Sequence, residues 1–150
     1  MYKRQVPERV LDLASGLEYR PARLGAVTPR GMLATSGTLI TDLREIARIE
    51  ARGAVAIDME TAAVAEVCEK RGCRWSVFRG ISDRADGGGA DADVLRLAGP
   101  DGRGNLPAVA RFVLTQPWRI PELARLAWGM SLATKCAASA ALRALEPSFA

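Results

Sequence analysis

The sequence predicts an α/β fold in which helices are layered on a central, mostly parallel or mixed sheet. A continuous apolar run, Ala54–Ile57, is typical of a strand that is buried on both faces. Residues 58–61 lead from it into a predicted helix that runs to about Arg71 and stops at Gly72. A second apolar stretch, Trp75–Ile81, comes next. This strand, helix, strand succession implies a right-handed crossover that returns the second strand beside or near the first. The length of 150 residues fits one domain over residues 1–150.

Short strands and turns are predicted before this unit. Residues 6–28 alternate apolar pieces with Gly16, Pro21 and Gly25, a pattern that is typical of one or two strands with their connecting turns. Met32–Gly37 has the pattern of a short apolar strand that leads into a glycine turn. We therefore expect two or three short strands in the first 40 residues.

A helix is predicted between these strands and the apolar run at residue 54. Asp42 and Glu45 form a D-x-x-E start signal, and Gly53 ends the pattern. Apolar residues recur between them at helical spacing: Leu43, Ile46, Ala47 and Ile49.

The C-terminal part predicts a loop and two helices. Residues 84–105 are rich in Asp and Gly, so we expect a mobile surface loop or lid there. Asn105 can cap a helix over Leu106–Thr115, which has a proline in its first turn. Pro121 then opens a longer helix that continues towards Leu145.

Composition excludes several classes of function. The chain is 49% hydrophobic and 25% charged, which is typical of a soluble globular protein. The net charge is +4, but the basic residues are spread along the chain, so no nucleic-acid partner is indicated. Histidine is absent, which excludes a Ser-His-Asp or Cys-His catalytic unit and a histidine metal ligand. Acid–base chemistry must therefore come from carboxylates, and we expect no metal site and no cofactor.

Cysteine usage and the apolar segments suggest a cytoplasmic protein. Cys68, Cys73 and Cys136 lack C-x-x-C spacing and are expected to be reduced thiols. No apolar segment typical of a secretory signal follows the first basic residues. Two basic residues interrupt the apolar tract 126–145, so we expect a packed helix there and no stable membrane insertion.

Two carboxylates are candidates for chemistry because each follows an apolar strand. Glu60 comes after Ala54–Ile57, and Asp83 comes after Trp75–Ile81. The crossover would bring both acids to the same rim of the sheet. A partly desolvated carboxyl group there could donate a proton, while a second, ionised carboxylate binds hydroxyl groups.

The same acids also have an ordinary structural interpretation, which the pattern alone favours. Asp58 or Glu60 can simply stabilise the positive N-terminus of the following helix. Asp83 can cap a turn through its side chain.

Two motifs distinguish these interpretations. The segment A-V-A-I-D-M-E-T-A-A-V-A at residues 54–65 is followed by V-F-R-G-I-S-D-R-A-D at residues 77–86. Together they resemble the purine nucleoside phosphorylase and methylthioadenosine/S-adenosylhomocysteine nucleosidase superfamily. The resemblance covers about residues 6–90 and implies a three-layer α/β nucleoside phosphorylase-like fold. It also implies cleavage of the N-glycosidic bond of a purine nucleoside, in particular one of adenine, by phosphorolysis or hydrolysis.

The resemblance assigns roles to four of these residues. Glu60 would accept hydrogen bonds from the 2′- and 3′-hydroxyls of the ribose, and Met59 would pack against the sugar face. Asp83 would be the general acid that protonates or hydrogen-bonds N7 of the purine, and Ser82 would orient it.

The base pocket departs from the pattern of the family. Residues 35–40 resemble a family segment, S-G-D-x-F, that lines this pocket. Thr38 stands where the family has Asp, and Ile40 stands where an aromatic residue often stacks on the base. Leu39 and Ile40 would therefore supply apolar walls only, and Leu39 could equally be an ordinary core residue.

The C-terminal part adds a looser resemblance. Residues 99–107 and 117–127 are similar to the end of hopanoid-associated phosphorylases, a branch proposed to remove adenine from adenosylhopane. The substrate would then be an adenine nucleoside with a large apolar 5′ group. The alternative is a plain packing helix with Trp118 and Trp128 in the core.

Members of the family are longer, and their N-terminal half holds the phosphate loop. We therefore expect an N-terminally truncated version of the fold, with inorganic phosphate as a possible co-substrate, a purine nucleoside as ligand and a homo-oligomeric state. Two other classes of function stay open. One is a catalytically incomplete nucleoside-binding module, and the other is an interaction subunit that pairs through an exposed sheet edge.

Overall fold

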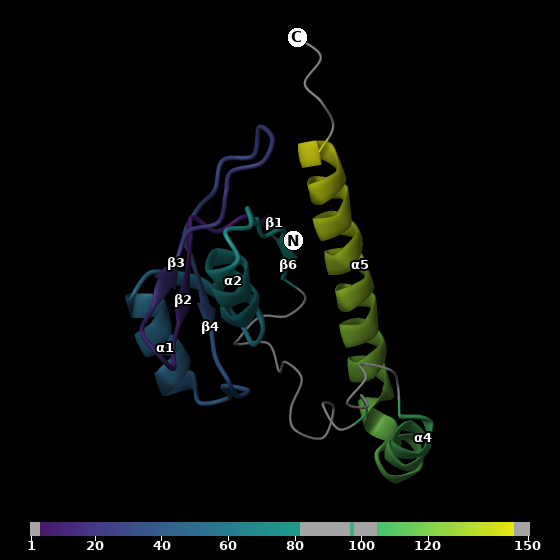
Figure 1. Ribbon diagram of the computed structural model, residues 1–150. Helices are drawn as coiled ribbons and strands as arrows, with labels where there is room; N and C mark the ends of the chain where they lie inside the picture. Colours follow the sequence, from purple (N-terminus) through teal and green to yellow (C-terminus); the bar gives the residue numbers. More distant parts are fainter. Residues whose placement is uncertain (1–3, 82–96, 98–104, 146–150) are drawn as a thin grey trace.

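The fold is built on a four-stranded mixed sheet, which the computed structural model shows in Figure 1. The structure describes residues 4–81, 97 and 105–145. Strands β2, β4 and β5 run parallel, whereas β3 is antiparallel to β2, and the order across the sheet is β3-β2-β4-β5. The strands have the bounds Arg9–Asp12 for β2, Glu18–Tyr19 for β3, Met32–Thr35 for β4 and Ala54–Asp58 for β5. The register pairs Thr35 with Asp58 at the carboxyl ends of β4 and β5.

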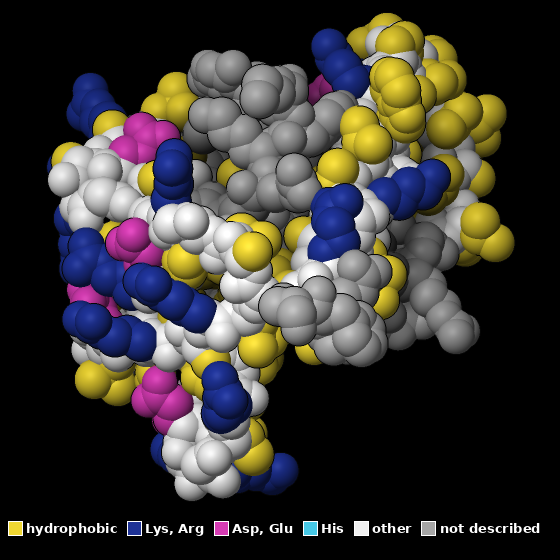
Figure 2. Space-filling model, turned by 90° about the horizontal axis from the view of Figure 1, so that it is seen from above, with side chains coloured by type: hydrophobic (Ala, Val, Ile, Leu, Met, Phe, Trp, Pro, Cys, Tyr) yellow, Lys and Arg dark blue, Asp and Glu magenta, His cyan; other side chains and the backbone are white. Residues whose placement is uncertain are grey.

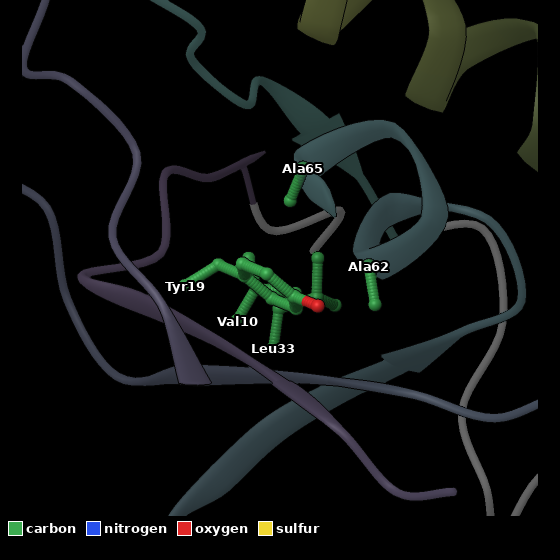
Figure 3. Packing of buried hydrophobic residues seen from close by; sticks show 5 residues of the cluster. All are labelled: Val10, Tyr19, Leu33, Ala62 and Ala65. Atoms are coloured by element: carbon green, nitrogen blue, oxygen red, sulfur yellow. The ribbon is translucent and has the colours of Figure 1, made fainter. Parts of the chain in front are cut away.

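Two helices cover opposite faces of this sheet and give the three-layer α/β arrangement that was predicted. Helix α2, Thr61–Lys70, lies over one face (Figure 3), where its buried alanines contact strand residues in a cluster of Val10, Tyr19, Leu33, Ala62 and Ala65. Helix α1, Leu43–Ala51, packs on the other face. There Ile49 joins a second cluster with Leu11, Met32, Ala34 and Ala54. Because successive strand residues point to opposite faces, Val10 and Leu11 serve different clusters.

Local signals set the ends of these helices, as predicted. The Asp42 carboxylate accepts a hydrogen bond from the backbone N–H of Arg44, 2.9 Å away, and so caps the start of α1. Gly53 follows α1 with a φ of 91°, and Gly72 follows α2 with a φ of 64°. Both angles are ones that residues with side chains rarely adopt, so glycine is favoured where these helices stop.

Strand β5 forms as predicted, but the expectation that both of its faces are buried is wrong. It lies at the edge of the sheet, and Val55 is 53% exposed. The apolar run reflects contact with α1 and with the hollow described below, rather than burial between two layers along its whole length.

The strand predicted over Trp75–Ile81 is shorter and has a different partner. Only Arg79–Gly80 forms a strand, β6, and it pairs antiparallel with β1, Arg4–Gln5, in a separate two-stranded sheet. It does not lie beside β5 in one sheet, but it does return near that strand, because Nη1 of Arg79 is 2.7 Å from Oδ2 of Asp58 at the end of β5. The segment before β6 is held by other contacts: Trp75 packs on the cluster under α2, and its carbonyl oxygen accepts a hydrogen bond from the N–H of Ala22 at 2.7 Å.

The C-terminal helices form close to their predicted bounds. Helix α4, Leu106–Thr115, is capped by Asn105, whose side chain accepts from the N–H of Ala108 at 3.3 Å. A short 3₁₀ helix, η1, covers Pro117–Arg119 and leads into α5, Ile120–Leu145. Within the described residues, no helix is long and apolar enough to cross a membrane.

Helix α5 packs against the small sheet of β1 and β6 (Figure 1). Its contact face is made of small residues, since Gly129, Ala133 and Ala140 are buried. The two tryptophans placed in the core by the alternative interpretation are instead exposed, Trp118 at 72% and Trp128 at 71%. Figure 2 shows hydrophobic side chains gathered on the side of the molecule where α4 and α5 lie. The expected loop or lid at residues 84–105 falls, apart from Leu97 and Asn105, outside the described residues.

Candidate functional site

A hollow of about 370 Å³ lies between β5, β6 and the segment that follows β4. It extends along β5 to the start of α2, so its inner end is at the carboxyl end of a parallel strand. This is the usual place for a ligand in an open α/β sheet. The lining residues are Thr38, Leu39, Ile40, Ile46, Glu50, Ala54, Val55, Ala56, Ile57, Asp58, Met59, Glu60, Arg79, Gly80 and Ile81.

The structure brings together the four residues that were predicted to bind substrate. Leu39 and Ile40 line the hollow from the segment after β4, and Met59 and Glu60 line it from the segment between β5 and α2. Leu39 is 40% exposed and Met59 is 44% exposed, so both offer apolar surface to a ligand. Ile40 also packs against the core cluster under α1 and therefore has a structural role as well.

The two predicted catalytic residues, Ser82 and Asp83, lie outside the described residues. The residue before them, Ile81, lines the hollow.

Asp58, which the sequence had offered only as a possible partner of the helix terminus, is the most heavily bonded acid of the site. Its side chain is fully buried. It accepts hydrogen bonds from the Thr35 hydroxyl at 2.7 Å, from the Thr61 hydroxyl, and from the Thr61 N–H at 3.4 Å. Asp58 therefore stabilises the start of α2 and joins it to β4, which confirms the helix-terminus interpretation for this residue.

Glu60 has a different environment, although it occupies the N-cap position of α2. Its side chain makes no capping hydrogen bond, and it is 72% exposed. Its Oε2 accepts a long hydrogen bond from the N–H of Met59, 3.4 Å away. The helix-terminus role thus falls to Asp58, and the carboxylate of Glu60 is accessible from the hollow.

Arg79 connects the two acids, and the sequence analysis gave it no role. Its Nη1 lies 2.7 Å from Oδ2 of Asp58 and 3.9 Å from Oε2 of Glu60. The sequence did hold a signal for a role of Arg79 in the site, because this residue begins the R-G-I-S-D segment that contains the predicted catalytic pair. Its partner could not be deduced from spacing, since it depends on where β6 lies relative to β5.

The chemistry of this arrangement suits a polar ligand with an apolar part. An accessible carboxylate can accept two hydrogen bonds from neighbouring hydroxyl groups. The methionine and aliphatic side chains beside it can contact a flat ring or a sugar face. Among the described residues, no group of acidic or cysteine side chains is arranged to hold a metal ion.

A comparison with protein-family models identifies the family. The model described as "Phosphorylase superfamily" matches residues 5–114, which is well over half of the chain. The chain belongs to the phosphorylase superfamily. The match spans the sheet, both of its covering helices and all the residues that line the hollow. Membership supports activity of the nucleoside phosphorylase or nucleosidase type, with nucleosides as substrates, and the α/β fold is consistent with it. Searches of curated proteins and of solved structures gave no significant match.

Proposed function

We propose that this phosphorylase-superfamily chain cleaves the N-glycosidic bond of a purine nucleoside, specifically one of adenine. The observation that carries the proposal is the accessible carboxylate of Glu60 beside Met59, in a hollow that also has the apolar side chains of Leu39 and Ile40. A nucleoside needs both kinds of surface, because its ribose is a diol and its base is a flat ring.

The ribose is bound by Glu60 in this proposal. The two carboxylate oxygens accept from the 2′- and 3′-hydroxyls, which are close enough to each other for bidentate binding. The support is that this side chain is free of a capping bond and 72% exposed. Met59 packs on the sugar. The negative charge of Glu60 stabilises the positive charge that develops on the ribosyl ring when the glycosidic bond breaks.

The base lies between the apolar walls of Leu39 and Ile40 and is protonated by Asp83. The carboxylic acid of Asp83, oriented by Ser82, gives its proton to N7 of the purine. The electron pair of the C1′–N9 bond leaves with the base, so the base departs neutral. In phosphorolysis an oxygen of inorganic phosphate then bonds to C1′. In hydrolysis the oxygen of water bonds to C1′, and the proton that the water loses restores the carboxylic acid of Asp83, directly or through solvent.

The proposed substrate carries a large apolar 5′ group, as adenosylhopane does. This finer assignment is supported by the likeness of residues 99–107 and 117–127 to hopanoid-associated phosphorylases. Apolar side chains on α4 and η1 are accessible to such a group: Leu114 is 82% exposed and Trp118 is 72% exposed.

The role of Glu60 can be tested by binding of two nucleosides, adenosine and 2′,3′-dideoxyadenosine, in thermal-shift titrations. A ligand that binds the native state raises the unfolding temperature. We expect adenosine to bind the natural chain about 10- to 100-fold more tightly than the dideoxy compound, as is typical of hydrogen bonds to a charged group. Glu60→Gln should remove most of this preference. Glu45→Gln, a neutralised glutamate on the exposed side of α1, is the matched control and should keep it.

The outcomes separate the possible functions. Equal affinity of the natural chain for the two nucleosides would contradict the proposal. Tight adenosine binding without release of adenine would instead identify a nucleoside-binding module.

A further inference from the structure

Asp58 makes a set of contacts that joins four parts of the fold. Its buried carboxylate accepts from Thr35 on β4, from two donors of Thr61 at the start of α2, and from Arg79 on β6. The Thr35 hydroxyl in turn accepts from the N–H of Ala62 at 3.1 Å, which ties α2 to β4 a second time. A carboxylate that is fully buried is stable only while its partners stay in place.

The guanidinium of Arg79 is held unequally between its two acidic neighbours. The same nitrogen, Nη1, is 2.7 Å from Asp58 and 3.9 Å from Glu60. The first distance is that of a short, charge-assisted hydrogen bond, whereas the second exceeds the range of one. The Asp58 side chain is fully buried and the Glu60 side chain is 72% exposed, so the stronger partner is the one that is closed to solvent.

This inequality matters for the acid that faces the hollow. An arginine without the buried partner would be drawn to the nearest other carboxylate and could form a bidentate pair with it. Such a pair would occupy the oxygen lone pairs that the hydroxyls of a ligand require. The present geometry leaves a positive charge near Glu60 but keeps the carboxylate available.

We propose that Asp58 is a positioning residue, which retains Arg79 and thereby keeps the Glu60 carboxylate free to bind the ribose diol. The inference rests on the proposed function, because it assumes that Glu60 binds ribose. It adds that the affinity for ribose depends on a buried acid that never contacts the substrate.

The test uses Asp58→Asn in the full chain, with Kd measured by calorimetry for adenosine and for 2′,3′-dideoxyadenosine. We expect adenosine binding to weaken about tenfold, because Arg79 then pairs with Glu60, whereas dideoxyadenosine binding changes less than about twofold. Asp58→Asn in a Glu60→Gln background should have almost no further effect on adenosine. Asp12→Asn neutralises an aspartate that lies outside the hollow and should leave both Kd values unchanged.

The double variant Asp58→Asn with Arg79→Gln distinguishes a positioning role of Asp58 from a purely structural role. It removes the freed guanidinium together with its buried partner, so it leaves no unpaired buried charge, and it should recover most of the preference for adenosine. A purely structural role for Asp58 would instead give the double variant the same loss as the single one, or a larger loss. If Asp58→Asn alone does not fold, the double variant decides: a retained preference supports the proposal and a lost preference overturns it.

Failure of this inference is distinct from failure of the proposed function. Equal loss of both nucleosides in Asp58→Asn, or no loss of either, overturns the positioning role while the natural chain still prefers adenosine. No preference in the natural chain overturns ribose binding by Glu60, and the positioning role with it.

Discussion

Gly80 on β6 lies directly against the backbone of Ala133 on α5. A β-carbon added to Gly80 would overlap the carbonyl oxygen of Ala133 and would come within 2.6 Å of its carbonyl carbon. The neighbour of Gly80 is Arg79, and both line the hollow. The close contact with α5 therefore fixes the strand that brings the arginine to the site.

Gly80→Ala should destabilise the fold for this reason. The clash is with backbone atoms, which cannot rotate away as a side chain can, so we expect a loss of about 1–3 kcal/mol in the free energy of unfolding. Gly37→Ala is the matched control, since a β-carbon there meets nothing within 4 Å. Urea unfolding of both variants measures the difference. Equal midpoints would show that α5 does not pack on β6 as described.

Thr35→Val should lower stability through the same buried network. The Thr35 hydroxyl donates to Asp58 at 2.7 Å and accepts from the N–H of Ala62 at 3.1 Å, and valine can do neither. Leaving buried polar groups without partners costs about 1–3 kcal/mol. Thr134→Val removes an exposed hydroxyl that bonds to its own helix, and it should change stability by less than about 0.5 kcal/mol. A comparison of thermal unfolding curves for the two variants checks this, and similar shifts would contradict it.

Alanine substitutions at Leu39 and Ile40 should affect nucleoside binding and fold stability differently. Leu39 is 40% exposed in the hollow, whereas Ile40 also packs on the core cluster under α1. Ile40→Ala should therefore cost about 1–2 kcal/mol, less than a fully buried isoleucine would. Leu39→Ala should leave the unfolding midpoint nearly unchanged and weaken nucleoside binding. Measuring nucleoside affinity and the unfolding midpoint for both variants tests this assignment. A large loss of stability in Leu39→Ala would show that Leu39 is a core residue instead.

Asp12 should contribute to stability in a way that depends on pH. The hydroxyl of Ser15, 2.6 Å away, and the N–H of Ala14 lower the pKa of the Asp12 carboxyl from its ordinary value. Because the folded state favours the ionised form, this contribution is present above the pKa of the unfolded chain. It is lost as the pH falls below about 4 and passes through the lower pKa of the folded state.

Ser15→Ala removes the largest cause of that shift. We expect the pKa of Asp12, followed by NMR, to rise towards its ordinary value, and the stability difference from the natural chain to shrink in acid. A constant difference from pH 7 to pH 2 would show that the hydroxyl acts on stability in some other way.

The sequence predicted the elements whose ends are set by neighbouring residues. Asp42 starts α1 and Asn105 starts α4 because a cap needs only the next two or three N–H groups. Gly53 and Gly72 end helices because of their own backbone angles. Such signals are complete within a few residues and can be read without a structure.

Pairing and burial were harder to predict because they depend on residues far apart in the chain. The apolar stretch at Trp75 predicts a strand, but its first part packs under α2, and only Arg79–Gly80 pairs, with β1. The exposure of Trp118 and Trp128 depends on which face of α5 meets the small sheet, and that face is the one with small residues.

The candidate site shows the same division. Met59, Glu60, Leu39 and Ile40 were found through motifs, and they do line one hollow. The role of Asp58 follows from contacts with Thr35 and Arg79, which the fold brings to it from more than 20 positions away. A buried acid at the end of a strand is a weak signal until those partners are known.

Release of free adenine tests the central claim most directly. The purified chain is incubated with adenosine, with and without inorganic phosphate, beside Asp83→Asn, and the products are separated by chromatography. We predict adenine from the natural chain and a rate at least about 100-fold lower in Asp83→Asn, as is typical when a general acid is lost. Dependence on phosphate would identify phosphorolysis, and independence would identify hydrolysis. Equal rates in the two proteins, or no adenine from the folded natural chain, would contradict the claim.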